Sequence, residues 1–390
     1  MSGGAILTLN AGSSSLRFAL FVAGVAMARG AVESLDGEPH LLAHDAAGAV
    51  MAERRWPAET PYADVLKTLL DVAESHLGGA DLAAVGHRVV HGGADHIAPE
   101  RVTPALLALL EALTPLDPLH MPRNLAPIRA IAVERPGMPQ VACFDTAFHH
   151  TLPLVARRFA LPRALEAEGI RRYGFHGLSF EYIAGKLAQH LPSLARGRVI
   201  IAHLGAGASL CALLDGRSID TTMGFSALDG LMMATRCGSL DPGVILYLGQ
   251  QGRSFAEVQD LLYRHSGLLG VSEISGDLRV LLASSDRRAQ EAIDLFTYRI
   301  ALEAGAMASA LGGLDGLVFT AGIGEHAPLI RAAVAARLAW LGLELDAAAN
   351  AAGTGRISAP GSRVEIHVID TDEEAMIAQH TQAILSQYAA

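Results

Sequence analysis

The chain has 390 residues, of which 51% are hydrophobic and 18% are charged, and its formal net charge is -10. This composition excludes an intrinsically disordered chain and supplies enough apolar material for two domains. The acidic balance, without a run of Lys or Arg, argues against nucleic acids and anionic membranes as partners.

The cysteines and the N-terminal sequence bear on the cellular compartment. Cys143, Cys211 and Cys237 are odd in number and lack the C-x-x-C spacing of a structural zinc site. No basic segment precedes an apolar run at the N-terminus, and no stretch of about 18 apolar residues occurs. The sequence therefore predicts a cytoplasmic protein without a signal peptide or a membrane span.

The first motif is a predicted hairpin. Apolar runs at 6–9 and 16–22 flank the turn 10–15, which is rich in serine and contains one glycine. The hydroxyls and backbone N–H groups of such a turn can approach an anion, and Arg17 adds positive charge. Asn10 offers an oxygen that suits Mg²⁺. A solvent-exposed hairpin with a polar turn explains this stretch equally well when it is taken alone.

Residues 199–214 repeat this pattern of strand, small-residue turn and strand. Gly205 aligns with Gly12, and His203 aligns with Asn10. The repeat predicts two similar domains, each with a phosphate-facing turn.

The first half of the chain alternates predicted strands and helices. Two helices are predicted to open with a Thr cap followed by Pro, one from Thr60-Pro61 to Gly78-Gly79 and one from Thr103-Pro104. The other elements are short strands over 22–56, a strand over 81–90, a loop at 115–122, a helix over about 124–134 and a strand over 140–145. The alternation favours α/β layers, with ligands at the carboxyl ends of the strands. Asp145 ends the last strand and is a candidate for chemistry, although a helix cap or loop aspartate would look the same.

The second half contains glycine-rich segments between regular elements. Glycines on both sides of Phe175-His176 predict a sharp turn, and Ser179 is expected to cap the helix that follows. The breaker-rich segments 221–230 and 235–243 predict ordered loops. The remaining predictions are a capping box at Ser254 and Glu257, a helix over 290–311, a strand over 316–320 with a glycine turn at 321–326, and a helix from Pro328 to about Gly342.

The C-terminal region has a strand over 364–369, acids at 370–374 and a final amphipathic helix. Thr371 and Glu374 fit a capping box, which would leave Glu373 free to face a metal ion or water. An alternative is that these acids only favour the positive end of the helix dipole.

Several enzyme classes are excluded by motif. The chain has no P-loop, no complete G-x-G-x-x-G after a strand, no H-E-x-x-H and no G-x-S-x-G.

Ten short motifs in order resemble one family. They are NAGSSSLR (10–17), HRVVHGG (87–93), FDTAFH (144–149), YGFHG (173–177), HLGAGAS (203–209), TTMGF (221–225), TRCGSLDPG (235–243), SGDLR (275–279), FTAGIGE (319–325) and DEE (372–374). In these motifs the chain resembles acetate kinases, members of the acetate and sugar kinase, Hsp70 and actin superfamily.

The resemblance implies an α/β protein of two actin-like (ribonuclease H-like) domains with an interdomain active-site cleft, and usually a homodimer. The N-terminal domain would span 1–146, completed by the C-terminal helix 374–390, and the nucleotide-binding domain would span 147–373. The implied reaction is the reversible, direct in-line transfer of a phosphoryl group from ATP to acetate, giving acetyl phosphate and ADP. The implied ion is Mg²⁺, with Mn²⁺ as a substitute.

Residue roles carry over from the resemblance by position. Asn10 and Glu373 would hold Mg²⁺, Arg17 would meet ATP phosphate, and Arg88 would bind the substrate carboxylate. Asp145 would be the catalytic acid, and His176 and Arg236 would stabilise the transition state. The acyl pocket would be lined by Val90, Leu119, Phe175 and Ala227. The ATP site would be lined by His203, Leu204, Gly205, Ala206, Gly207, Asp277, Leu278, Arg279, Gly322, Ile323, Gly324, Glu325 and His326.

The chemistry of the acceptor agrees with these roles. Acetate, with a pKa of about 4–5, is already ionised at pH 7, so it needs no general base. We therefore expect Asp145 to act through Mg²⁺ or a bound water. Arginine forks suit both carboxylate and phosphate oxygens.

The chain departs from the usual family pattern at four positions. The family usually has Lys at Arg17, Asn at Ala206 and His326, and Pro at Ala227. A smaller residue at 227 could admit propionate, so a propionate or butyrate kinase is the nearest alternative. A sugar kinase, a sugar-sensing regulator and an actin-like filament protein are the others; the regulator would carry a basic DNA-binding module, which the sequence lacks.

Overall fold

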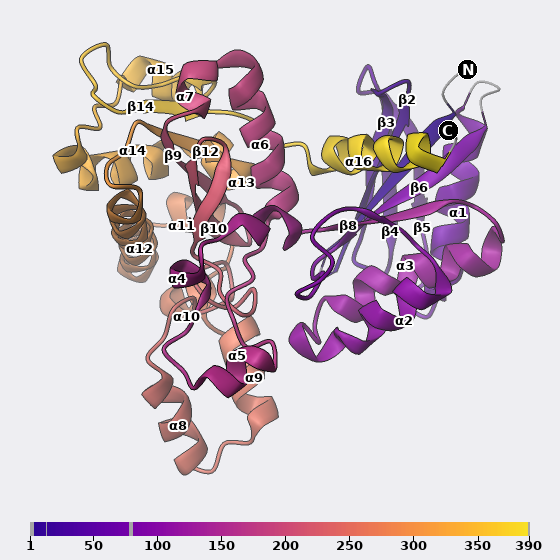
Figure 1. The fold of residues 1–390 in the computed structure, drawn as a ribbon, viewed down its shortest axis with the longest axis horizontal. Coiled ribbons are helices and arrows are strands. Elements are labelled where there is room, and N and C mark those ends of the chain that lie inside the picture. Colours follow the sequence, from indigo (N-terminus) through magenta and orange to yellow (C-terminus); the bar gives the residue numbers. More distant parts are fainter. Residues whose placement is uncertain (1–3, 13, 78–80, 389–390) are drawn as a thin grey trace. The chain divides into compact units, whose positions relative to one another are not determined.

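The computed structural model describes residues 4–12, 14–77 and 81–388. By internal contacts they form two compact units, one made of Met1–Phe148 with Asp372–Ala390 and one made of His149–Thr371 (Figure 1). The chain thus leaves the first unit after Phe148 and returns to it after Thr371. Ser13 of the first predicted turn, and Gly78-Gly79 of the predicted helix stop, lie outside the described residues.

The first unit is built on one large sheet. Its strands are β1 (Ala5–Ala11), β2 (Leu16–Val22), β3 (Val25–Glu33), β4 (His40–Asp45), β5 (Val50–Arg55), β6 (Leu82–Val89), β7 (Glu100–Arg101) and β8 (Gln140–Phe144). Its helices are α1 (Tyr62–Ser75), α2 (Pro104–Ala112), η1 (Thr114–Leu116), α3 (Met121–Glu134) and α16 (Glu373–Tyr388). The short helix η2 (Ala147–Thr151) spans the crossing to the second unit.

The second unit has a smaller sheet and more helices. Its strands are β9 (Arg198–Leu204), β10 (Ala208–Leu214), β11 (Arg217–Thr221), β12 (Gly316–Thr320), β13 (Gly355–Arg356) and β14 (Glu365–Val368). Its helices are α4 (Leu154–Arg157), α5 (Arg163–Ala167), α6 (Gly177–His190), α7 (Pro192–Ala195), α8 (Pro242–Gln250), α9 (Phe255–Arg264), α10 (Gly267–Ser272), α11 (Leu278–Ala283), α12 (Arg287–Leu311), α13 (Ala321–His326), α14 (Pro328–Arg337), η3 (Ala339–Leu341) and α15 (Ala347–Ala352).

The two sheets share one topology. The strand orders are β5-β4-β3-β2-β1-β6-β8-β7 and β11-β10-β9-β12-β14-β13. In each sheet an antiparallel hairpin, β1–β2 or β9–β10, is extended by two parallel strands on the side of its first strand. The repeated hairpin seen in the sequence is therefore a repeated sheet, and the predicted α/β class is confirmed.

The sheet of the first unit is covered on both faces. Side chains alternate along β1, so Leu7 and Leu9 pack with α1 while Ile6 packs with Ala378 of α16. Helix α16 contacts β1, β6 and β8 and runs back onto this sheet from the far end of the chain (Figure 1). Gly86 permits this approach, because a Cβ there would lie 2.3 Å from Oγ1 of Thr381 in α16. Asn10 has the same parity as Ile6, which places it on the α16 face.

The second unit is organised around α12, which packs on β9, β10 and β11. Its buried positions include Ala292, Phe296 and Ile300, spaced as one helical face. The predicted helix at 290–311 is confirmed, with a start at Arg287. The loops predicted at 221–230 and 235–243 contain no helix or strand between Thr221 and Pro242.

Helix starts were predicted with mixed success. The hydroxyl of Thr103 accepts from Leu106 N, and Ser254 and Glu257 form the predicted capping box. Thr60 was wrong as a cap, since α1 begins at Tyr62 after Pro61, without a side-chain cap. Ser179 was also wrong, because α6 begins two residues before it.

Two other boundaries differ from the prediction. Pro122 was assigned to a loop, but α3 begins at Met121 and accommodates this proline in its first turn, where the missing N–H costs nothing. The glycine turn expected at 321–326 is itself the short helix α13. The helix from Pro328 ends at Arg337, and η3 leads from there to Gly342.

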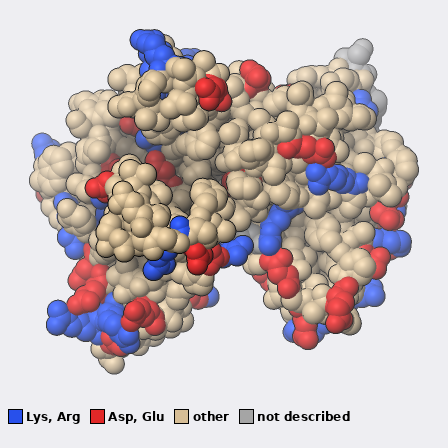
Figure 2. Space-filling model, turned by 90° about the horizontal axis from the view of Figure 1, so that it is seen from below, with Lys and Arg blue, Asp and Glu red and all other residues tan. Residues whose placement is uncertain are grey.

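The surface carries charges of both signs. On the face shown in Figure 2, Lys and Arg lie among Asp and Glu, and large areas carry neither. Among the helices of the described residues, none combines the length and apolar character needed to cross a membrane.

Candidate active site

Asn10 and the start of α16 bring one amide and two carboxylates together in the first unit. The side-chain nitrogen of Asn10 donates to Oε2 of Glu373 at 2.8 Å and to Oε1 of Glu374 at 3.2 Å. Burial, followed by the charge of Glu373, raises the pKa of Glu374. The carboxylates of Glu373 and Glu374 thus lie close together where water is partly excluded, and a bound cation would stabilise their charges.

This arrangement corrects the predicted capping box. The N-terminus of α16 is capped by Asp372, whose Oδ1 accepts from Ala375 N at 2.8 Å. The hydroxyl of Thr371 instead bonds to Ser179 Oγ at 2.8 Å. Glu374 is therefore not consumed by capping, and it joins Glu373 at the candidate metal site. Glu374 was missed as a metal ligand because the sequence analysis assigned its side chain to a capping box with Thr371.

Arg88 and Asp145 meet at the carboxyl ends of two neighbouring parallel strands. Arg88 of β6 pairs in register with Cys143 of β8, and Asp145 follows β8 directly. Nε and Nη2 of Arg88 both donate to Oδ2 of Asp145, at 3.0 Å and 2.5 Å. Burial alone would lower the pKa of Arg88, but Asp145 and Glu373 outweigh it and raise the pKa.

Asn124 supports this end of the sheet and was missed by the sequence analysis. It is 1% exposed, donates to the carbonyl of Ala11 at 2.8 Å and accepts from Val90 N at 2.8 Å. It thus ties the end of β1 to the segment after β6. An asparagine inside a predicted helix gave no signal, because its partners are distant in sequence.

The other predicted site residues of the first unit are Arg17, Val90 and Leu119. Arg17 is exposed and is the strand partner of Asn10 in the β1–β2 hairpin. Val90 is buried and Leu119 is half-buried. Their partners in the predicted acyl pocket, Phe175 and Ala227, are buried in the second unit. The acyl pocket itself stays a prediction.

His176 and His203 lie together in the second unit. Their rings stack with centroids 4.2 Å apart and planes 17° apart. Nδ1 of His176 bonds to Ser209 Oγ at 2.7 Å, and Nδ1 of His203 bonds to Ser179 Oγ at 2.8 Å. The predicted sharp turn is confirmed, with φ of +80° at Gly174 and of +58° at His176.

Gly207 belongs to the same neighbourhood. The amide of Gly205 donates to the carbonyl of Gly207 at 2.9 Å, which closes the tight turn between β9 and β10. A Cβ at Gly207 would lie 3.1 Å from Nε2 of His176. The glycine turn and the two histidines thus form one cluster, with the carbonyl of Ala206 accepting from Ala234 N at 3.1 Å.

The segment Gly322–His326 forms α13 at the end of β12. Oε1 of Glu325 accepts from Ala321 N at 2.7 Å, so this carboxylate holds the first turn of the helix. Arg331 holds the other end, since its Nη1 donates to the carbonyls of Gly324 and Glu325 at 2.8 and 2.7 Å. Arg331 is 1% exposed, and the sequence analysis missed it because a lone arginine in a helix usually lies on the surface.

Asp277 and Arg279 pair with each other at the start of α11. The Asp277 side chain accepts from Arg279 N at 2.9 Å and caps the helix. Hydrogen bonds from the Arg279 side chain lower the pKa of Asp277. The Arg279 side chain is 90% exposed, so it is accessible to a ligand.

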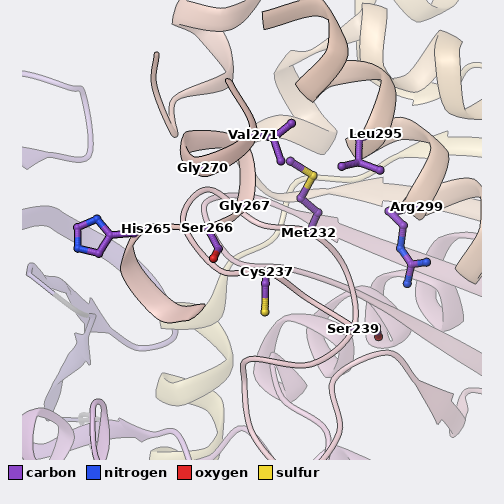
Figure 3. Close-up of a pocket in the computed structure, with 10 residues that line it drawn as sticks. All are labelled: Met232, Cys237, Ser239, His265, Ser266, Gly267, Gly270, Val271, Leu295 and Arg299. Carbon is purple, nitrogen blue, oxygen red and sulfur yellow. The ribbon is translucent and has the colours of Figure 1, made fainter. Parts of the chain in front are cut away.

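Arg236 lies in the loop after Thr221. Its Nη1 donates to the carbonyl of Ala227 at 3.0 Å, which links two predicted site residues. A cavity of about 380 Å³ lies next to it, lined by Cys237, Ser266 and Arg299 among others. In Figure 3 the apolar side chains of Met232, Val271 and Leu295 gather along this cavity. Its lining includes no predicted site residue.

Comparison with known proteins identifies the family. A family model described as the acetokinase family matches residues 5–379. The chain belongs to the acetokinase family. It is 55% identical to an acetate kinase of Rhodopseudomonas palustris, over 96% of this chain and 97% of that one. The resemblance found in the sequence is therefore confirmed.

Solved structures of this family share the fold. An acetate kinase of Porphyromonas gingivalis matches with a TM-score of 0.87 at 37% identity, over 98% of this chain and 100% of that one. A propionate kinase of Francisella tularensis matches with a TM-score of 0.90 at 37% identity, over the same shares. The fold is thus the actin-like fold of short-chain acyl kinases, and shape alone does not separate acetate from propionate as substrate.

Proposed function

We propose that the protein catalyses reversible phosphoryl transfer between ATP and acetate, giving acetyl phosphate and ADP by direct in-line transfer. The observation that carries the proposal is the 55% identity, over nearly the whole chain, to an acetate kinase. Three relatives named acetate kinase, at 48–55% identity, support acetate and not propionate as the acceptor of this protein.

In the first unit, Arg88 would bind the substrate carboxylate. A guanidinium presents donors in a fixed plane that matches two carboxylate oxygens. Asp145 accepts two hydrogen bonds from Arg88, so we propose that it orients this guanidinium. Acetate is ionised at neutral pH and needs no proton acceptor, which agrees with an orienting role.

The acidic cluster fits Mg²⁺. Glu373 and Glu374 supply hard oxygen ligands, and the Asn10 side chain, which contacts both carboxylates, adds an amide oxygen. We propose that these residues hold Mg²⁺, with Mn²⁺ as a substitute. When bound, the ion neutralises charge on the nucleotide phosphates. Arg17, across the hairpin from Asn10, would contact the phosphates.

In the second unit, the glycine turn His203–Gly207 and the segment Gly322–His326 would bind ATP together with Asp277–Arg279. Small residues allow a phosphate to approach the backbone closely at these two segments. His176 and Arg236 would stabilise the charge that spreads over the transferred phosphoryl group. We propose accordingly that 147–373 is the nucleotide-binding domain and that 1–146 with 374–390 is the other domain.

We also propose a homodimer in the cytoplasm. Helix α8 carries no charged residue, and its Leu246 and Tyr247 side chains are 68% and 58% exposed. An uncharged, exposed helix is typical of an interface. The three cysteines are odd in number and lack C-x-x-C spacing, which suits a reducing compartment. Sedimentation velocity of the purified protein would show twice the chain mass if the dimer forms.

The function is tested by a hydroxamate assay for acyl phosphate with ATP, Mg²⁺ and acetate, propionate or butyrate. We expect the highest kcat/KM with acetate. Omission of Mg²⁺ or of the carboxylic acid is the control and should abolish the signal. A protein that forms no acyl phosphate from any of the three acids would contradict the proposal.

A further inference from the structure

Thr371 is the last residue of the second unit, and two contacts anchor it there. Its backbone N–H donates to Oε1 of Glu325 at 3.0 Å, and its hydroxyl bonds to Ser179 Oγ at 2.8 Å. The side chain is half-buried and makes no cap for the helix that follows. Thr371 thus belongs to the second unit by its hydrogen bonds, although the chain leaves that unit at the next residue.

One carboxylate oxygen of Glu325 accepts hydrogen bonds from two separate segments, the start of α13 and Thr371. Oε1 accepts from Ala321 N at 2.7 Å as well as from Thr371 N. Ala321 has φ of +64°, a left-handed conformation that is unfavourable for a residue with a Cβ. Such strain persists where the surroundings hold it, and it is frequent at ligand sites. Glu325 therefore fixes the start of α13 and Thr371 in one position relative to each other.

Ser179 links the same threonine to the histidine pair. Its hydroxyl lies 2.8 Å from Thr371 Oγ1 and 2.8 Å from Nδ1 of His203. His203 stacks on His176. Two of the segments proposed to bind nucleotide are therefore linked to Thr371 by hydrogen bonds. Glu325 bonds to it directly, and His203 is linked to it through Ser179.

The chain after Thr371 leads into the candidate metal site. Asp372 caps α16 and forms an ion pair with Arg29 at 2.5 Å. Glu373, the next residue, accepts from Asn10. Only two peptide bonds separate Thr371 from Glu373, so the position of one limits the position of the other.

We propose that Thr371 and Glu325 are positioning residues that couple nucleotide binding in the second unit to metal binding by Glu373. In this role the Glu325 carboxylate holds two backbone N–H groups, so the segment Gly322–His326 would contact ATP through its other residues. A carboxylate turned toward the phosphates would repel them, whereas one that accepts two N–H groups is stabilised where it is. The inference rests on the proposed function, because it assumes that the nucleotide binds with Mg²⁺.

Isothermal titration calorimetry of ADP binding, with and without Mg²⁺, tests the coupling without relying on turnover. For the wild type we expect Mg²⁺ to tighten ADP binding, and the ratio of the Kd without Mg²⁺ to the Kd with Mg²⁺ is the coupling factor. Thr371→Val keeps the shape but removes the hydroxyl, and the loss of one hydrogen bond should reduce that factor about 3–10-fold. Thr371→Ser should restore it. Glu325→Gln should also reduce it, since a neutral amide is a weaker acceptor.

Thr297→Val is the matched control, because Thr297 is buried in α12 and its hydroxyl bonds to the carbonyls of Ile293 and Asp294 in its own helix. This variant should keep the wild-type factor. The inference is overturned if Thr371→Val binds ADP and MgADP like the control. It is also overturned if Thr371→Ser loses the wild-type factor although both variants melt at the wild-type temperature. If Thr371→Val does not fold, Glu325→Gln decides in the same way. A wild type without acyl kinase activity in the hydroxamate assay would refute the proposed function separately.

Discussion

Arg88 donates two hydrogen bonds to the same oxygen of Asp145, from Nε at 3.0 Å and from Nη2 at 2.5 Å. Its remaining terminal nitrogen, Nη1, makes a long contact of 3.4 Å to the carbonyl of Ala11. We expect an incoming carboxylate to bind through Nη1. The Asp145 side chain is 1% exposed, so the pair depends on both partners being present.

Arg88→Ala should raise KM for acetate about 10–100-fold, since a hydrogen bond to a charged group contributes about 1.5–3 kcal/mol. It should also destabilise the first unit, because Asp145 would be left buried without its cation. Steady-state kinetics and thermal melting measure the two effects. Arg88→Lys keeps the charge without the planar fork and should lie between the wild type and Arg88→Ala. An unchanged KM for acetate would contradict the assignment.

Arg236→Ala should mainly lower kcat, by about 100–1,000-fold, because we assign this guanidinium to charge that develops in the transition state. The matched control is Arg264→Ala, which removes an exposed arginine of α9 that pairs with Asp260. The control should keep wild-type kinetics. If Arg88→Ala and Arg236→Ala both changed only KM, and by the same factor, this division of roles would be wrong.

Ala227→Leu should narrow the predicted acyl pocket and disfavour propionate more than acetate. One methylene in an apolar pocket is worth about 1–3 kcal/mol, so the acetate-to-propionate ratio of kcat/KM should rise about 10-fold or more. Because the carbonyl of Ala227 holds Arg236, the side chain can change while this hydrogen bond is kept. Equal losses for both acids would place residue 227 outside the acyl pocket.

Glu374→Gln should stabilise the protein in the absence of Mg²⁺ at pH 7. Burial and the Glu373 charge raise the pKa of Glu374 in the folded protein. The protonated side chain therefore contributes its full stability below the pKa of the unfolded state, and this contribution is lost as the pH rises through the pKa of the folded state. Neutralising it should raise Tm by about 2–4 °C if the gain is about 1 kcal/mol, and reduce the further rise caused by Mg²⁺. Differential scanning fluorimetry with and without Mg²⁺ measures both.

A control for this effect is Glu303→Gln, since burial also raises the pKa of Glu303 in the second unit, next to Arg299. Its Mg²⁺ response should equal that of the wild type. If Glu374→Gln and Glu303→Gln responded to Mg²⁺ alike, Glu374 would not belong to the metal site.

Stability should fall as the pH drops from about 6.5 to about 4, partly because of His87. Burial lowers the pKa of His87 from 6.5 to about 4, so in this range the unfolded state binds a proton that the folded state does not. His87→Leu should flatten the decline. It should also lower stability at pH 7, because Gln140 would lose its hydrogen-bond partner on His87. Urea midpoints at pH 7 and pH 5 test this, and an unchanged difference between them would count against it.

Much of the fold was predictable because local patterns and long-range packing agree. The hairpins at Asn10 and His203 are visible as alternating apolar runs around small-residue turns, and their likeness correctly indicated a repeated sheet. Thr103 and Ser254 were found because a cap depends on partners within three residues. The strand that ends at Asp145 was found because its apolar run is short and bounded by polar residues.

Three of the misses share one physical cause: the side chains bond to residues outside the local sequence window. Ser179 looked like a cap, but its hydroxyl bonds to Thr371 and His203. Glu374 looked like part of a cap, but it contacts Asn10, 364 positions away. No local rule identifies Arg331 as the residue that holds α13, because its guanidinium is buried by contacts to Asn350. The order of motifs, unlike these contacts, is readable without a structure.

The return of α16 to the first sheet constrains how the protein can be made. Ile6 and Gly86 face a helix that follows the entire second unit in the chain. During synthesis, which starts at the N-terminus, that face of the sheet stays uncovered while residues 149–371 are produced. A ribosome-bound chain that has just finished Thr371 should therefore expose an apolar surface to chaperones, and this exposure should end once α16 has emerged.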